Sequence, residues 1–205
     1  MRLLAKLIQY MNRDKKPLPH FWYFPRGEKA VVIMTGDDHG SGNTVGRFNH
    51  YLDISPVGCS VQDWECIRGS SFMFMNSSVM SPALAASFNA QGFEVGLHVN
   101  TGCVDWTPAS LANYYQSQLA NWDATYVGLE RQMSERTHCV NWTDWATQPK
   151  VQALNGIRMD TNYYYYPPAW VQERPGMFTG SGMVMRFADL DGTMIDVYQA
   201  VTQMT

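Results

Sequence analysis

The chain has little charge, no excess of basic residues and no long apolar run, and each absence excludes a class of protein. Charged residues make up 16% of its 205 residues, and the formal net charge is -3. Without a basic excess there is no electrostatic footprint for nucleic acid or for an anionic membrane surface. No stretch approaches the roughly 20 apolar residues that span a bilayer. We therefore expect a globular protein without a nucleic-acid partner or a membrane span, and the sequence leaves its oligomeric state open.

Cysteine is also scarce. The chain has four cysteines, and because none form a Cys-x-x-Cys pair a structural zinc knuckle is not expected. Cys59 and Cys66 have a spacing compatible with a small disulfide-closed loop, although four buried thiols fit the sequence equally well. Residues 1–8 are too short and too charged for a secretory signal and predict an amphipathic helix instead. The compartment stays open, since a trimmed signal would still be compatible with secretion.

Hydrophobic periodicity predicts strands that alternate with helices, which is typical of an α/β protein with a parallel sheet or barrel. Residues 1–28 are expected to form a leader with one short helix and a segment rich in proline and aromatics. Residues 29–205 are expected to form the main domain, which ends in a β-hairpin around an Asp-Gly turn. The expected strands are 30–34, 71–75, 93–98, 137–140 and 156–160, and the expected helices are 43–52, 82–92, 108–122 and 145–155.

Polar residues follow the first predicted strand and end the third. Asp37, Asp38 and His39 come directly after the apolar run 30–34, and His98 closes the strand 93–98. Such groups are costly to bury without a role, and the ends of parallel strands are where α/β folds hold their chemistry. An aspartate and a histidine from two strand ends could share a divalent cation, which leaves the other aspartate to move protons. This pattern predicts a metal-assisted hydrolase.

Four motifs in order resemble those of the polysaccharide deacetylases. Residues 35–40 resemble the Thr-Phe-Asp-Asp-Gly motif, and residues 94–98 are similar to Glu-Ile-Gly-x-His. Residues 136–138 occupy the place of an Arg-x-Pro motif, and residues 156–162 resemble Gly-x-Arg-Tyr-Asp-Ser-Ser. The order and spacing agree from about residue 30 to residue 168. The chain is thus identified as resembling a divergent polysaccharide deacetylase, of the type grouped as family 4 carbohydrate esterases.

The resemblance implies a fold, a reaction and a set of residues. The fold would be a distorted β/α barrel, incomplete at the C-terminus of this chain. The reaction would be metal-dependent removal of acetyl groups from an acetylated polysaccharide or oligosaccharide, with Zn²⁺ as the expected divalent cation. Asp37 would act as the general base and Arg136 would hold it ionised. Asp38 and His98 would hold the metal.

The third metal ligand departs from the family pattern. The family has a second histidine four residues after the first, and here that position is Gly102. His138 or His39 could replace it. We favour His138 because neighbouring residues on an extended segment point in opposite directions, which would turn His39 away from Asp38.

Aromatic and polar residues beyond the third motif are candidates for substrate contact. Trp142, Asp160 and Tyr163 are expected to bind the glycan, although Trp142 could instead be a packed indole beside a helix-capping Asp144. The proline of the third motif and the late strand-end histidine that serves the family as general acid have no match. These gaps support a rival reading, a carbohydrate-binding relative that has lost turnover. A hydrolase of other substrates on the same scaffold is a further alternative.

Overall fold

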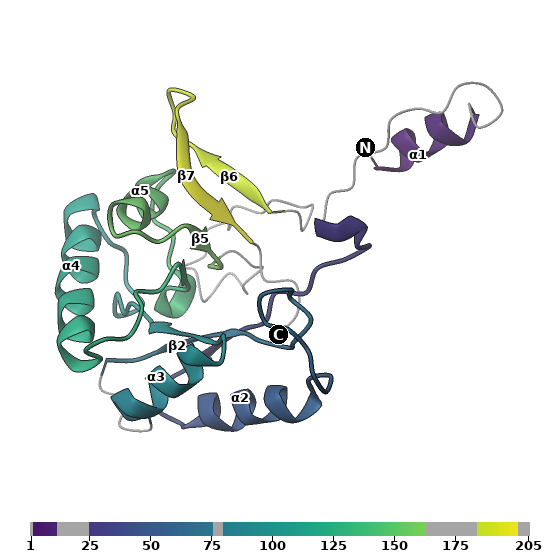
Figure 1. The fold of residues 1–205 in the computed structure, drawn as a ribbon. Coiled ribbons are helices and arrows are strands. Elements are labelled where there is room, and N and C mark those ends of the chain that lie inside the picture. Colours follow the sequence, from purple (N-terminus) through teal and green to yellow (C-terminus); the bar gives the residue numbers. More distant parts are fainter. Residues whose placement is uncertain (1, 12–24, 76–79, 163–183, 201–205) are drawn as a thin grey trace. The chain divides into compact units, whose positions relative to one another are not determined.

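The computed structural model describes residues 2–11, 25–75, 80–162 and 184–200, which fall into two compact units (Figure 1). The first unit, residues 1–33, holds the helix α1 (Arg2–Met11) and the short 3-10 helix η1 (Pro25–Gly27). The second unit, residues 34–205, holds all the other elements. The division falls a few residues after the boundary expected at residue 28. Within the described residues, no helix has both the length and the apolarity that crossing a membrane requires.

The second unit contains two sheets built mainly from parallel strands. The first sheet has the order β1-β2-β3, all parallel, and the second has the order β4-β5-β7-β6, in which only the β6-β7 pair is antiparallel. The strands are β1 (Thr35–Asp38), β2 (Ser70–Met73), β3 (Glu94–Leu97), β4 (Ser134–Glu135), β5 (Met159–Asp160), β6 (Met185–Ala188) and β7 (Met194–Gln199). The parallel α/β class is confirmed, but the described strands form two open sheets and not the closed barrel that the resemblance implied.

Side chains, rather than backbone pairing, join β3 of the first sheet to β4 of the second. The amide of Gln132 accepts a hydrogen bond from the Leu97 N–H and donates to the carbonyl oxygens of Leu97 and Ser134. Glu94 accepts from the Ser134 N–H at 3.0 Å. Gly96 leaves room for this amide, since a Cβ there would lie 2.8 Å from the Gln132 Cδ. These hydrogen bonds join the two sheets between β3 and β4, a place that we call the seam.

Helices cover the sheets where their N-terminal signals predict them. In the described part of the second unit, the α-helices are α2 (Asn43–Ile54), α3 (Pro82–Ala90), α4 (Pro108–Thr125) and α5 (Thr147–Leu154). Ser81 and Thr107 cap α3 and α4, each followed by a proline at the first helical turn. Contacts pack α2 against β1, α3 and α4 against β3, and α5 against β7 (Figure 1).

The main core lies between these helices and the first sheet. It includes the fully buried Phe48, Phe93 and Leu111, and the Phe48 and Phe93 rings stack with centroids 4.2 Å apart. A smaller cluster lies where α5 meets the hairpin, and it includes Phe187 and Val197. The hairpin itself confirms the prediction: β6 and β7 pair around a turn in which the Gly192 N–H donates to the Asp189 carbonyl oxygen.

Two predicted strands were wrong in position. Residues 30–34 are not a strand, and Val32 is 69% exposed; the strand begins at Thr35 because its partner β2 begins at Ser70, which pairs with it. Residues 137–140 are not a strand either. They contain the 3-10 helix η2 (His138–Val140). The strand β4 ends at Glu135, two residues before Thr137. At the first of these places, the apolar run lies before the paired segment instead of within it.

Candidate metal centre

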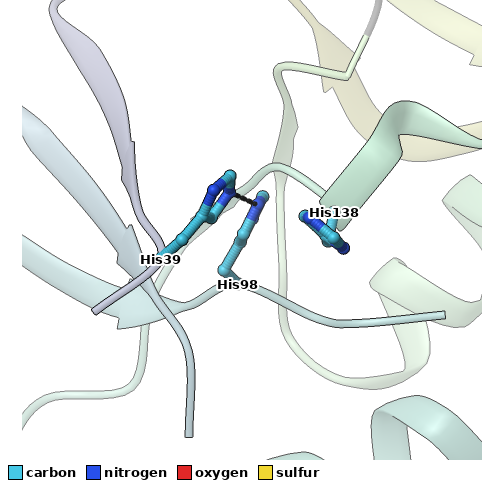
Figure 2. A group of neighbouring side chains, drawn as sticks. All are labelled: His39, His98 and His138. Atoms are coloured by element: carbon cyan, nitrogen blue, oxygen red, sulfur yellow. Dashed lines mark hydrogen bonds between the residues drawn. The ribbon is translucent and has the colours of Figure 1, made fainter. Parts of the chain in front are cut away.

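Four successive strand ends converge on one place in the second unit. His39 follows β1, Phe74 follows β2, His98 follows β3, and His138 begins η2 after β4. Figure 2 shows the three imidazoles turned toward one another. Parallel strands deliver their carboxyl ends to the same edge, so this convergence follows from the topology. We call His39, His98 and His138 the histidine cluster.

The spacing of the histidine cluster fits a metal ion. One ligand nitrogen from each ring lies within 4.8 Å of the others. The Nε2 atoms of His39 and His98 are 3.3 Å apart, joined by the dashed line in Figure 2. Two nitrogens on a tetrahedral zinc with bonds of about 2.0–2.1 Å lie roughly 3.3 Å apart. The cluster therefore has the donor type and the spacing of a three-histidine cation site.

The hydrogen bond of the His98 Nδ1 leaves the lone pair of this ring on Nε2, the nitrogen that faces His39. Its Nδ1 lies 2.6 Å from the carbonyl oxygen of Arg136. A carbonyl only accepts, so Nδ1 carries the proton and Nε2 presents a lone pair. Burial lowers the pKa of His98 to about 4, against the opposing charge of Asp37. The ring is thus neutral and oriented, as metal-ligating histidines are.

His138 and His39 complete the cluster from more open positions. Burial lowers the pKa of His138, and the neighbouring His39 adds to that lowering. The Nδ1 of His138 lies 3.2 Å from the side-chain oxygen of Asn100, which orients the ring. His39 is exposed, so the cluster is open to solvent on its side. A cation and a small ligand could therefore reach it.

Phe74 packs against the whole histidine cluster. Its ring stacks on His39 at 4.9 Å and on His98 at 5.5 Å between centroids. It meets His138 edge to face at 4.9 Å. An apolar wall on one side of a polar site excludes water there and strengthens electrostatic interactions inside.

The structure brings Asp37 and Arg136 together, as the sequence predicted. The Nη1 of Arg136 lies 3.2 Å from the Oδ2 of Asp37, and its Nη2 donates to the Thr35 hydroxyl at 2.8 Å. The Oδ1 of Asp37 is buried and has no hydrogen-bond partner among the described residues. The charge of Asp37 acts on both His98 and His138. A carboxylate beside the histidine cluster with one oxygen held by Arg136 and the other without a partner in the described part of the chain can accept a proton there.

Asp38 lies apart from the histidine cluster, contrary to the expectation that it holds the metal. Its Oδ1 accepts from the N–H groups of Gly40, Ser41 and Gly42, and its Oδ2 accepts from the N–H and hydroxyl of Thr44. Burial alone would raise its pKa, but these bonds lower it to about 2. Among the described residues, no group with metal-ligand spacing includes it. This carboxylate instead caps α2 and shapes the loop before it.

Asp160 was expected to bind substrate, but its carboxylate is fully buried. It accepts from the Gln152 and Asn162 side chains at 2.5 and 2.7 Å. The same Gln152 amide donates to Glu135, which also accepts from the Tyr115 hydroxyl at 2.7 Å. Burial raises the pKa of Glu135 to about 8 and that of Asp160 to about 6. We call Glu135 and Asp160 the buried carboxylate pair; a group so enclosed does not contact a glycan.

The other two expected substrate contacts are Trp142 and Tyr163. The Trp142 ring stacks on that of Phe187, with centroids 5.5 Å apart, and packs against the small cluster between α5 and the hairpin. Nearby, Asp144 accepts from the Thr147 N–H at 2.9 Å, which agrees with the alternative of a capping aspartate. Tyr163 lies outside the described residues.

All four cysteines are paired in the structure. Cys59 bonds to Cys66, and Cys103 bonds to Cys139. The first pairing agrees with the small loop that the spacing allows. The second joins the loop after β3 to η2, next to His138.

Sequence reasoning ranked His39 below His138, and the structure brings both into the cluster. The alternation of side chains along the segment agrees with the structure, but the prediction assumed that Asp38, and not His39, faces the metal site. On the extended segment, Asp37 and His39 share one side and Asp38 takes the other, so it is Asp38 that turns away. Phe74 and Glu135 were not singled out. Phe74 directly follows β2, and Glu135 is the last residue of β4. These positions at strand ends are the signal that could have found them.

Comparison with known proteins places the fold. Neither a protein-family model nor a curated protein matches the chain. Among solved structures, it is similar to a Mycobacterium smegmatis protein assigned as a polysaccharide deacetylase, with a TM-score of 0.55 and 14% identity over 88% of this chain and 61% of that one. It is also similar to a family 4 carbohydrate esterase from Streptomyces lividans, solved in complex with acetate, with a TM-score of 0.45 and 18% identity over 66% of this chain and 64% of that one.

The first of these likenesses defines a class of fold. The similarity to the M. smegmatis protein shows that the chain has a divergent deacetylase-like fold. The chain spans less than two thirds of the length of either solved structure. A shared fold does not fix a reaction, because function depends on the residues at the site.

Proposed function

We propose that this chain is a metal-dependent hydrolase of the polysaccharide deacetylase type, which removes acetyl groups from an acetylated polysaccharide or oligosaccharide. One observation carries the proposal: the histidine cluster lies beside the Asp37–Arg136 pair at the carboxyl ends of parallel strands. The fold, shared with a polysaccharide deacetylase, supports the choice of an acetylated glycan as substrate.

The histidine cluster is the proposed holder of the cation. Three imidazoles form a ligand set of catalytic zinc sites, which keep a fourth position for water or substrate. The Arg136 carbonyl oxygen fixes the His98 ring, and Asn100 fixes that of His138. When bound, a divalent cation supplies Lewis-acid chemistry, because it polarises the acyl carbonyl and makes water more acidic.

The residues of the chain supply the proton transfer. The Oδ1 of Asp37 accepts the proton of the attacking water, while Arg136 holds the other carboxylate oxygen. Phe74 excludes water from one side of the cluster. Tyr163 remains a proposed sugar contact, and Trp142 and Asp160 are not carried into the proposal because of their packing.

Metal analysis and acetate release test the proposal. Protein purified without chelator should contain a divalent cation and release acetate from chitin oligomers or acetylated xylan, and EDTA should abolish the release. His98→Ala should weaken cation affinity by more than about 100-fold, since even partners that only orient a ligand contribute 10–100-fold. His50→Ala is the matched control, because His50 is exposed on α2 outside the cluster. A wild-type protein that binds no divalent cation would overturn the proposal.

A second candidate is a carbohydrate-binding relative without turnover. It is favoured by the position of Asp38, which caps α2 instead of joining the histidine cluster. In that case the zinc-loaded protein would bind chitin oligomers in a calorimetric titration without releasing acetate. Release of acetate that depends on Asp37 would exclude this candidate.

A further inference from the structure

The sulfur atoms of Cys103 and Cys139 both lie against His138. The Nδ1 of His138 is 3.7 Å from the Cys103 sulfur and 3.5 Å from the Cys139 sulfur. One ligand atom from each of the three residues lies within 4.8 Å of the others. In the oxidised chain the two sulfurs are bonded to each other and cannot serve as thiolate ligands.

His138 belongs to two possible ligand sets at once. The centroid of its ring lies 4.9 Å from that of His39 and 5.3 Å from that of His98, and the same ring contacts both cysteine sulfurs. A neutral imidazole carries a proton on one nitrogen and a lone pair on the other. One neutral His138 can therefore bind a single cation, either with the histidine cluster or with the two cysteines.

We propose that reduction of the Cys103–Cys139 disulfide creates a second metal site, made by Cys103, His138 and Cys139, which competes with the histidine cluster for His138. The second site takes a soft cation such as Zn²⁺ or Cu⁺, because thiolates prefer such ions. Its existence does not depend on the proposed function. The competition does, since it requires the histidine cluster to hold a cation in the oxidised chain.

The chemistry balances with an external reductant. A phosphine and one water reduce the sulfur–sulfur bond to two thiols, and the phosphine takes the oxygen and becomes a phosphine oxide. Binding of a divalent cation then replaces the two thiol protons, which are released to solvent. Cys103 is exposed and Cys139 is half-buried, so a small reductant can reach the bond.

The other disulfide provides an internal comparison. Cys59 and Cys66 are also paired, but among the described residues no histidine or carboxylate completes a metal-ligand group with them. Two thiols without a third protein ligand make a weaker site. Reduction of this disulfide should therefore leave the cation binding of the chain nearly unchanged.

Cobalt titration of the metal-free protein tests the proposal. The titrations use Co²⁺ under anaerobic conditions, before and after reduction with a phosphine, in a Cys59→Ser/Cys66→Ser background that isolates the second disulfide. The reduced protein should show the near-ultraviolet charge-transfer band of thiolate-bound cobalt, and the oxidised protein should not. Further replacement of Cys103 and Cys139 by serine should abolish the band, and His138→Ala should weaken Co²⁺ binding at the reduced site by about tenfold or more.

Each result bears on one claim. A reduced protein without the sulfur band, or with a band that survives the Cys103→Ser/Cys139→Ser change, would overturn the second site. A band that does not respond to His138→Ala would overturn the sharing of that residue. Circular dichroism of each variant shows that it is folded. If the oxidised protein binds no cobalt while the reduced protein gives the band, the proposed function fails and the second site stands.

Discussion

The histidine cluster follows the strands β1, β3 and β4, the buried carboxylate pair lies on β4 and β5, and the polar atoms of the two groups have opposite surroundings. In the histidine cluster, His98 and His39 face each other with nitrogens 3.3 Å apart, and the site is open to solvent at His39. In the buried carboxylate pair, a single Gln152 amide donates to both Glu135 and Asp160, and both carboxylates are fully buried.

The difference shows how the fold separates groups that can bind a ligand, the chemical side of the comparison, from groups that stabilise the interior, its support side. Desolvation keeps the imidazole of His98 neutral, which is the form that binds a cation. Desolvation also favours a protonated form for Glu135, and that group then serves as a hydrogen-bonded part of the interior. Both regions contain perturbed titratable groups, but only the first has lone pairs left for a ligand. Shifted pKa values alone would therefore not have distinguished the candidate metal site from the buried carboxylate pair.

Asp37→Asn gives the largest expected effect and tests the chemical side of the comparison. Hydrolysis should fall by about 10²–10⁴-fold, because a general base contributes that much, while the divalent cation content should stay unchanged. Acetate release and metal analysis of the same preparation measure both. Asp53→Asn is the control, since this exposed aspartate lies on α2. Wild-type turnover in Asp37→Asn would mean that another group is the base.

Asp38→Ala tests whether a carboxylate next to the site belongs to the chemistry or to the support. Loss of the acceptor for Gly40, Ser41, Gly42 and Thr44 should lower the free energy of unfolding by about 3 kcal/mol, while the folded protein keeps its cation. The pKa of Asp38 is lowered from 3.8 to about 2 in the folded state. Its stabilising effect is therefore present above pH 4 and is lost as the pH falls toward 2.

Urea unfolding at several pH values and metal analysis of the folded fraction check this prediction. The difference in stability between wild type and Asp38→Ala should shrink between about pH 4 and pH 2. A folded Asp38→Ala protein that binds no cation would return Asp38 to the metal site.

Glu135→Gln tests the support side. The pKa of Glu135 is raised from 4.5 to about 8, so its contribution to stability is full below about pH 4.5 and is lost as the pH rises through 8. The glutamine variant has no such proton to lose, so it should lack this part of the decline between pH 5 and pH 8. Urea unfolding of both proteins at pH 5 and pH 8 measures the difference. The same decline in both proteins would show that Glu135 is not protonated in the fold.

Gly96→Ala gives a smaller effect at the seam between the sheets. Its Cβ would lie 2.8 Å from the Gln132 Cδ, so the amide must shift, and the free energy of unfolding should fall by about 1–3 kcal/mol. Gly46→Ala is the matched control: it lies in α2 with nothing within 4 Å, and it should raise stability by about 0.5–1 kcal/mol. Thermal or urea unfolding compares the two. Equal effects would mean that the Gln132 amide is not fixed.

Local signals were enough for the helices and for much of the site. The Ser81-Pro82 and Thr107-Pro108 pairs mark the starts of α3 and α4 because capping depends on a few neighbouring residues. The strand ends at His98 and the Asp37–Arg136 contact followed from motif order. Their catalytic roles stay predictions.

What could not be read from the sequence depends on distant partners. The start of β1 is set by β2, so the apolar run 30–34 alone placed it too early. The choice between Asp38 and His39 depends on which face of β1 the helix α2 covers. The Cys103–Cys139 bond joins residues that only the packing of β3 against β4 brings together. Spacing along the chain contains none of this information.

The seam at Gln132 is a place where the structure can open locally, because its hydrogen bonds depend on one side chain. The N–H and the carbonyl of Leu97 are both bonded to one side chain there, and not to a neighbouring strand. A single change of rotamer at Gln132 would break both hydrogen bonds at once, whereas the backbone ladders on either side would have to separate as units. Amide hydrogen exchange at Leu97 would then be governed by a side-chain motion, faster than in the paired strands around it.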